Sequence, residues 1–160
     1  MTYGGCKEPP CVNMEALHTK AAKLLAENGA RRTIHGIRGW WYGADPANYR
    51  DANRTRAEID SVVIHTAEGY TGGMEAFRDP AREASAHYAV QWDGTLVQMV
   101  EDKNIAWHAS SANNRSIGIE HTGFAHAMQP GTSTQWSRAL LRSSAKLVAK
   151  LARAYKIPIN

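Results

Sequence analysis

The chain has 160 residues, of which 43% are hydrophobic and 21% charged, proportions typical of one globular domain with its own core. Its formal net charge of +4 arises within residues 1–56, while acidic and basic residues balance over residues 57–160. The sequence has no basic run interleaved with aromatic residues and no helix-turn-helix, zinc-finger or RNP pattern, so we expect no nucleic-acid partner.

The chain also has no apolar stretch of the ~18 residues that a membrane span needs. Its start, Met-Thr-Tyr-Gly-Gly-Cys-Lys, lacks the apolar region of a secretory signal. We therefore expect no membrane insertion and synthesis in the cytoplasm. Action outside the cell would then require release by lysis or by another route that uses no signal peptide.

The first predicted element is an amphipathic helix that follows two cysteines. Cys6 and Cys11 flank Lys-Glu-Pro-Pro, and this spacing is compatible with a small disulfide-closed loop or with two separate thiols. Asn13 is a suitable N-cap for a helix that runs to about Asn28, with an apolar stripe of Leu17, Ala21, Leu24 and Leu25. Residues 30–57 are rich in Arg, Gly, Asn and Tyr and predict a wrapping loop or linker.

Strands and helices alternate over the rest of the chain. Asp93-Gly94 lies between two alternating runs and predicts a β-hairpin. The expected strands are residues 61–65, 85–92, 95–100 and 116–121, and the expected helices are residues 74–78 and 137–155. This arrangement predicts an α/β fold with a mixed central β-sheet flanked by helices.

Three histidines, His65, His87 and His108, lie at strand ends or in the loops beside them. Neutral imidazole at the end of a strand is a good zinc ligand, because the sheet fixes its direction while the loop leaves room for substrate. A single histidine is more often a hydrogen-bonded polar residue than a ligand, so the position of His65 alone leaves both interpretations open.

Glu120 adds a second group that is suited to catalysis. Strand periodicity over residues 116–121 places Ile117, Ile119 and His121 on one face, where the isoleucines should meet the core. Glu120 then lies on the other face beside Gly118, which leaves space. A carboxylate there is suited to act as a general base on metal-bound water, although an ordinary exposed glutamate fits the same pattern.

Five ordered motifs complete the sequence pattern: VVIHTAEG, SAHYAVQWDGTLVQMV, AWHAS, NNRSIGIEHTG and SSAKLVAKLARAYKIPIN. In this order and at these separations they resemble the zinc-dependent N-acetylmuramoyl-L-alanine amidases of type 2, which share a fold with the peptidoglycan-recognition proteins. The resemblance covers about residues 44–160 as an amidase domain. It leaves residues 1–43 as an N-terminal extension made of a helix and a loop.

The resemblance assigns roles to individual residues. His65 matches the first zinc ligand, and Glu120 matches the catalytic glutamate, while Ala86 stands where some relatives carry a tyrosine. Trp107 should brace the loop that carries the next matched histidine. The positions that match the lining of the muramyl-peptide groove are His87, His108 and Asn113.

By the same resemblance, the expected reaction is hydrolysis of the amide between N-acetylmuramic acid and L-alanine of peptidoglycan. It uses Zn²⁺ and no organic cofactor, in a monomeric enzyme of phage-endolysin or bacterial-autolysin type. The family's second and third zinc ligands follow the segment that is here residues 156–160, so the remaining ligands are expected after Asn160. This lack favours an alternative, a non-catalytic peptidoglycan-binding module of the same fold, while His65 and Glu120 favour the enzyme.

Overall fold

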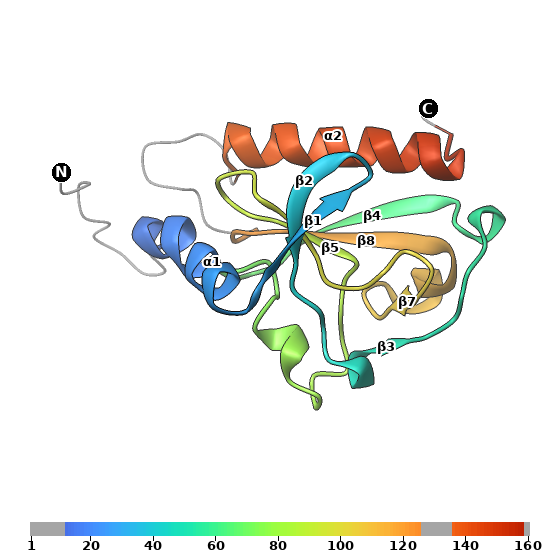
Figure 1. The fold of residues 1–160 in the computed structure, drawn as a ribbon, viewed down its shortest axis with the longest axis horizontal. Helices are drawn as coiled ribbons and strands as arrows, with labels where there is room; N and C mark the ends of the chain where they lie inside the picture. Colours follow the sequence, from blue (N-terminus) through green and yellow to red (C-terminus); the bar gives the residue numbers. More distant parts are fainter. Residues whose placement is uncertain (1–11, 126–135, 159–160) are drawn as a thin grey trace.

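A mixed six-stranded β-sheet runs through the middle of the structure, a computed structural model that describes residues 12–125 and 136–158 (Figure 1). The strands lie in the order β1-β2-β6-β5-β8-β4. Their bounds are Ala30–Ile34 (β1), Ile37–Trp41 (β2), Ser61–Thr66 (β4), Tyr88–Val90 (β5), Leu96–Gln98 (β6) and Ser116–His121 (β8). β4, β8 and β5 are parallel, whereas β6 is antiparallel to β5. The predicted α/β fold with a mixed sheet is confirmed.

Short elements surround this sheet. A two-stranded antiparallel sheet pairs β3 (Tyr49–Arg50) with β7 (Ile105–Ala106). The described residues also form the 3-10 helices η1 (Pro46–Asn48), η2 (Arg56–Glu58), η3 (Ala76–Arg78) and η4 (Ser110–Arg115). The helix expected over residues 74–78 is therefore a single 3-10 turn, η3. Within the described part of the chain, no helix has the length and apolar character of a membrane span.

The long helix α2 (Arg138–Tyr155) covers one face of the sheet (Figure 1). Ser137 caps it, since its hydroxyl accepts a hydrogen bond from the Leu140 N–H at 3.0 Å, and Lys156 ends it in the left-handed conformation, with φ of 56°. The apolar stripe of α2 buries Leu140, Leu147 and Leu151 against the sheet residues Tyr88, Val90, Ile117 and Ile119, whereas Leu141, also predicted to belong to the stripe, is exposed. Burial of this stripe fixes which face of β8 points toward α2.

Helix α1 (Met14–Asn28) packs against the opposite face of the sheet (Figure 1). The Asn13 side chain accepts a hydrogen bond from the Ala16 N–H, which confirms the predicted N-cap. Two buried α1 side chains, Ala21 and Leu25, share a core cluster with sheet residues such as Ala89 and Val97, and Leu24 packs against it. The helix predicted in the N-terminal extension is thus confirmed, and it packs on the same sheet as the rest of the chain.

The prediction of a loop or linker over residues 30–57 is wrong for the first half of this segment, which forms the β1–β2 hairpin. His35 and Gly36 close the hairpin with φ values of 47° and 77°, the left-handed pair that a two-residue turn requires. β2 then pairs in parallel with β6 and extends the central sheet. Arg31 lies over the Trp40 ring at 3.8 Å, and such stacking lets charged residues occupy an edge strand whose pattern looks like a loop.

The β5–β6 hairpin predicted from Asp93-Gly94 is confirmed. β5 and β6 pair antiparallel, and Gly94 has φ of 87°. The Asp93 side chain accepts a hydrogen bond from the Thr95 N–H at 2.8 Å and so stabilises the turn. Cys6 and Cys11 lie outside the described residues.

Candidate active site

His65 and Glu120 lie side by side on neighbouring parallel strands. They are direct register partners of β4 and β8, and Glu120 is also the partner of Ala89 in β5. Residues that are directly paired across strands project from the same face. His121, the next residue of β8, bonds Ser144 of α2 on the other face at 2.7 Å, so His65 and Glu120 project from the face opposite α2. The alternation predicted for residues 116–121 is confirmed.

A pocket of about 320 Å³ opens on this face at the carboxyl ends of β4 and β8. Its lining includes Glu120 and His108, with Trp107 and Phe77 as aromatic walls and Arg82 at an exposed position. Besides Glu120, four separate segments contribute to it, namely residues 66–68, 73–77, 82–85 and 107–108. Strands of a parallel array end together at this edge, and the loops that follow them leave the open space.

The Glu120 carboxyl is the unsatisfied acidic group of the pocket. Its Oε2 is buried and has no hydrogen-bond partner within residues 12–125 and 136–158. Desolvation by burial raises the pKa of Glu120 to about 7, because the charged form has lost water without gaining a donor. A carboxyl with this pKa exchanges a proton near neutral pH, which suits a general base.

A chain of hydrogen bonds orients His65. Its Nε2 lies 3.0 Å from Nδ1 of His108, and Nε2 of His108 lies 3.2 Å from the Ser116 hydroxyl oxygen. Ser116 donates its own hydroxyl proton to the Ala112 carbonyl at 2.7 Å, so its oxygen accepts from His108. His108 therefore accepts from His65 at Nδ1. This direction of donation leaves Nδ1 of His65 as an unprotonated acceptor.

Both of these histidines are held neutral. Desolvation by burial lowers the pKa of His65. Burial first, and then the electrostatic influence of the nearby His87, His65 and Arg54 side chains, lowers the pKa of His108 to about 3. Neutral imidazoles keep the hydrogen-bond direction described above at neutral pH.

Gly118 makes room for the His108 ring. A Cβ at Gly118 would lie 2.5 Å from Cγ of His108, closer than nonbonded carbon atoms approach. The space expected beside Glu120 is thus occupied by this imidazole. Asn113 holds the same loop from the other side, since its Oδ1 accepts from the backbone N–H of His108 at 3.0 Å and of Ala109 at 2.6 Å. Asn113 orients the His108 loop and is not among the residues that line the pocket.

His87 does not line the groove as expected, because its side chain has no exposed surface. Its Nδ1 accepts a hydrogen bond from the Gly118 N–H at 3.0 Å, so the ring proton sits on Nε2 and faces the Asn104 carbonyl at 3.1 Å. Burial and the charge of Arg54 lower the pKa of His87 to about 4. His87 therefore holds β8 through its bond to Gly118 and packs edge-on against the His108 ring, with the two ring centroids 5.7 Å apart.

Sequence reasoning missed Arg54, a buried cation that ties the His108 loop to the sheet. Its guanidinium donates to the backbone carbonyls of Asp102, Asn113, Asn114 and Ser116 at 2.7–3.3 Å and lies 2.9 Å from Nε2 of His87. Arg54 is only 7% exposed. An arginine in a polar, glycine-rich segment gives no sequence signal of burial, because its partners are backbone groups far away in the chain.

A family model for N-acetylmuramoyl-L-alanine amidase matches residues 55–160. The chain belongs to this family. It is 36% identical over 113 residues to N-acetylmuramoyl-L-alanine amidase A of Achromobacter lyticus. That match covers 69% of this chain and 59% of the relative, so the chain spans less than two thirds of the relative's length.

Solved structures of amidases share the fold. A mutant endolysin from Bacillus subtilis superposes with a TM-score of 0.52 and 23% identity, covering 74% of this chain and 77% of that chain. The E. coli amidase AmiD, in complex with the substrate anhydro-N-acetylmuramic acid-L-Ala-D-gamma-Glu-L-Lys, gives a TM-score of 0.53 and 24% identity, covering 68% of this chain and 49% of AmiD. At these identities the structures show the fold alone.

The residues that the structure describes could supply only part of a zinc site. Nδ1 of His65 is free to accept and Glu120 lies beside it, which fits the start of such a site. Within residues 12–125 and 136–158, however, no group of three His, Cys, Asp or Glu residues could hold a metal ion. His87 and His108 do not complete the set, because one is buried and the other bonds His65. The ligands expected after Asn160 lie outside the described residues.

Proposed function

We propose that this protein hydrolyses the amide bond between N-acetylmuramic acid and the L-alanine of the peptidoglycan stem peptide. The observation that carries the proposal is the pairing of His65 with Glu120 across β4 and β8, at the edge of the pocket. Membership of the amidase family supports it. So does the substrate named in the AmiD complex, a muramyl peptide with L-Ala, D-gamma-Glu and L-Lys.

Glu120 is the proposed proton acceptor. Its buried, unpaired Oε2 and its pKa of about 7 equip it to take a proton from attacking water and to return it to the leaving amine of L-alanine. Trp107 and Phe77 wall the pocket and exclude bulk water from the reacting groups. His108 keeps its hydrogen bond with His65 and so fixes the direction of the His65 ring.

Zinc is the proposed cofactor, with His65 as one ligand through Nδ1 and the other ligands expected after Asn160. When bound, zinc polarises a carbonyl and activates water for attack. The expected action on cell walls, as in an endolysin, is part of the same proposal.

Two substitutions in the full-length protein, supplied with zinc, test this function. Glu120→Gln should lower turnover of a muramyl tripeptide a hundredfold or more with little change in affinity, because a general base acts in the transition state. His65→Ala should lose both zinc, measured by mass spectrometry, and hydrolysis, measured by chromatography. Glu27→Gln, on the exposed side of α1, is the matched control and should behave as wild type.

Unaltered turnover in Glu120→Gln would show that a group other than Glu120 accepts the proton from the attacking water. Full zinc occupancy in His65→Ala would refute the ligand assignment. A wild-type protein that binds the muramyl tripeptide yet never cleaves it at any zinc concentration would be a non-catalytic peptidoglycan-binding module.

A further inference from the structure

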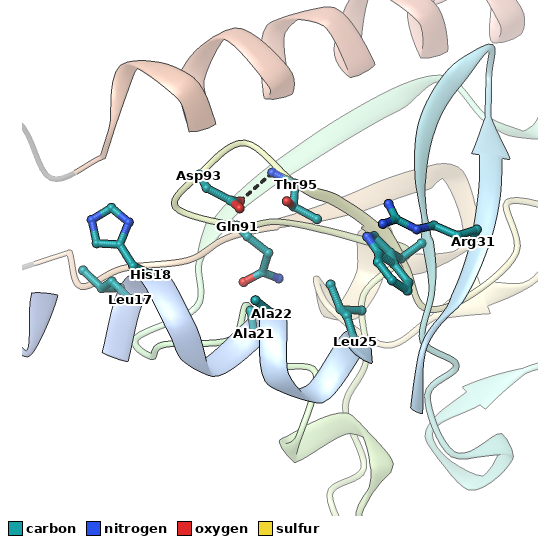
Figure 2. A pocket seen from close by; sticks show the side chains of 10 residues that line it. Leu17, His18, Ala21, Ala22, Leu25, Arg31, Gln91, Asp93 and Thr95 are labelled. Atoms are coloured by element: carbon teal, nitrogen blue, oxygen red, sulfur yellow. Dashed lines mark hydrogen bonds between the residues drawn. The ribbon is translucent and has the colours of Figure 1, made fainter. Parts of the chain in front are cut away.

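A second pocket, here called the distal pocket, lies on the same face of the sheet as Glu120. It has a volume of about 220 Å³ and lies between α1, the β1–β2 hairpin and the β5–β6 turn (Figure 2). The side chains of Leu17 and Leu25 from α1 contribute apolar surface, and Trp40 of β2 contributes an indole. Most of these residues precede position 55, where the family match begins, so the distal pocket is built largely by the N-terminal part of this chain.

Two opposite charges stand at the distal pocket without neutralising each other. The Arg31 guanidinium lies over the Trp40 ring, with Cζ 3.8 Å from the ring centroid. Asp93 is on the turn across the pocket (Figure 2). Within the described part of the chain, neither Arg31 nor Asp93 belongs to an ion pair. Both residues are exposed, and Asp93 uses only Oδ1 to cap the turn. The pocket therefore offers a cation, an anion and an apolar surface to one ligand.

The strand register places the distal pocket in line with the candidate active site. Trp40 pairs with Val97, Val97 with Ala89, and Ala89 with Glu120, so Trp40 and Glu120 are three strands apart in one row. At a strand spacing of ~4.8 Å this separation is about 14 Å. An extended peptide covers about 14 Å in four residues. A stem peptide whose first amide lies at Glu120 thus reaches Trp40 with its fourth residue, or with a long side chain on its third residue, such as that of lysine.

A turn separates the two pockets. Gly72 lies against Ala89, where an added Cβ would meet the alanine methyl group at 2.7 Å. Gln91, which lines the distal pocket, donates to the Thr71 carbonyl at 3.1 Å and holds this turn down on the sheet. A bound peptide would therefore pass over residues 71–74 between the two pockets.

We propose that the distal pocket binds the part of the peptidoglycan stem peptide that carries an ammonium group and a carboxylate, with Asp93 contacting the ammonium and Arg31 the carboxylate. This proposal rests on the proposed function, since peptidoglycan supplies the peptide. A residue such as the L-Lys in the AmiD substrate has the required ammonium. The distal pocket then determines which stem peptides are preferred and plays no part in the bond cleavage.

The test compares two substrates in the full-length protein with zinc, a muramyl tripeptide that ends in L-Lys and a muramyl dipeptide that lacks it. Asp93→Asn and Arg31→Gln should each raise KM for the tripeptide about fivefold, the order measured for exposed ion pairs, with kcat unchanged. Both variants should hydrolyse the dipeptide as wild type does. Arg138→Gln, exposed on α2 across the sheet, is the matched control.

Equal KM changes for both substrates, or no change for either, would refute the proposed binding of the stem peptide in the distal pocket. Neither result would affect the proposed amidase function. If the wild type cleaves neither substrate, titration calorimetry with the tripeptide separates the two proposals. Binding weakened by Asp93→Asn would then support the pocket while the amidase function fails. Binding of a peptide-free glycan fragment that depends on Trp40 and not on Asp93 would overturn the peptide assignment.

Discussion

Replacement of Gly118 by alanine tests whether the position of the His108 ring requires a residue without a side chain at position 118. The added methyl would lie 2.5 Å from Cγ and 2.7 Å from Cδ2 and Nδ1 of His108. Nonbonded carbon atoms prefer about 3.5–4.0 Å, so the ring has to move by about 1 Å. Gly118 is buried in β8 and has no positive φ, so the effect is steric and leaves the backbone conformation unstrained.

The expected cost has two parts. Overpacking of a well-packed site costs about 1–3 kcal/mol. A shift of that size also stretches the His65–His108 and His108–Ser116 hydrogen bonds, now 3.0 and 3.2 Å, at about 1 kcal/mol each. We therefore expect Gly118→Ala to lower the free energy of unfolding by about 3–5 kcal/mol. It should also reduce hydrolysis, because His65 loses the bond that orients it.

Urea unfolding followed by circular dichroism measures the loss. Gly69→Ala is the matched control, since its added Cβ would meet only a carbonyl oxygen at an ordinary 3.6 Å. In the double variant Gly118→Ala with His108→Ala the methyl has space, so the two changes together should cost about 1–3 kcal/mol less than their sum. Additive costs, or a Gly118→Ala protein within 0.5 kcal/mol of wild type, would refute the steric account of Gly118.

Two further predictions concern the groups behind the site. Arg54→Met leaves buried backbone carbonyls without a donor and should cost at least ~3 kcal/mol of unfolding free energy. Arg115→Met, which removes only an exposed ion pair with Asp60, should cost less than ~1 kcal/mol; equal costs would contradict the role of Arg54. Because the pKa of His87 is about 4 in the folded protein and about 6.5 when exposed, its contribution to stability is present above pH 6.5 and lost as the pH falls through 4. That loss is about 3 kcal/mol and should be absent from His87→Gln in unfolding measured across this range, whereas an identical pH dependence in both proteins would exclude His87 as its source.

Local patterns in the sequence were sufficient for the elements that carry the site. The Asn13 cap, the Asp93-Gly94 turn and the apolar stripe of α2 each act over a few neighbouring residues, and each element forms where they predict it. The alternation in β8 likewise set Glu120 on the face away from the isoleucines, because a strand has a period of two.

Only the tertiary structure decided which side chains meet. The pairing of His65 with Glu120 depends on the parallel register of strands that lie 55 positions apart, and no short turn joins these strands to set that register. The same holds for His87, whose burial depends on backbone groups of β8 and of the Asn104 loop. The β1–β2 hairpin became part of the sheet because β6 offered a free edge and the Trp40 ring accepted a guanidinium. These contacts are non-local, so their free energy exists only once the chain has folded.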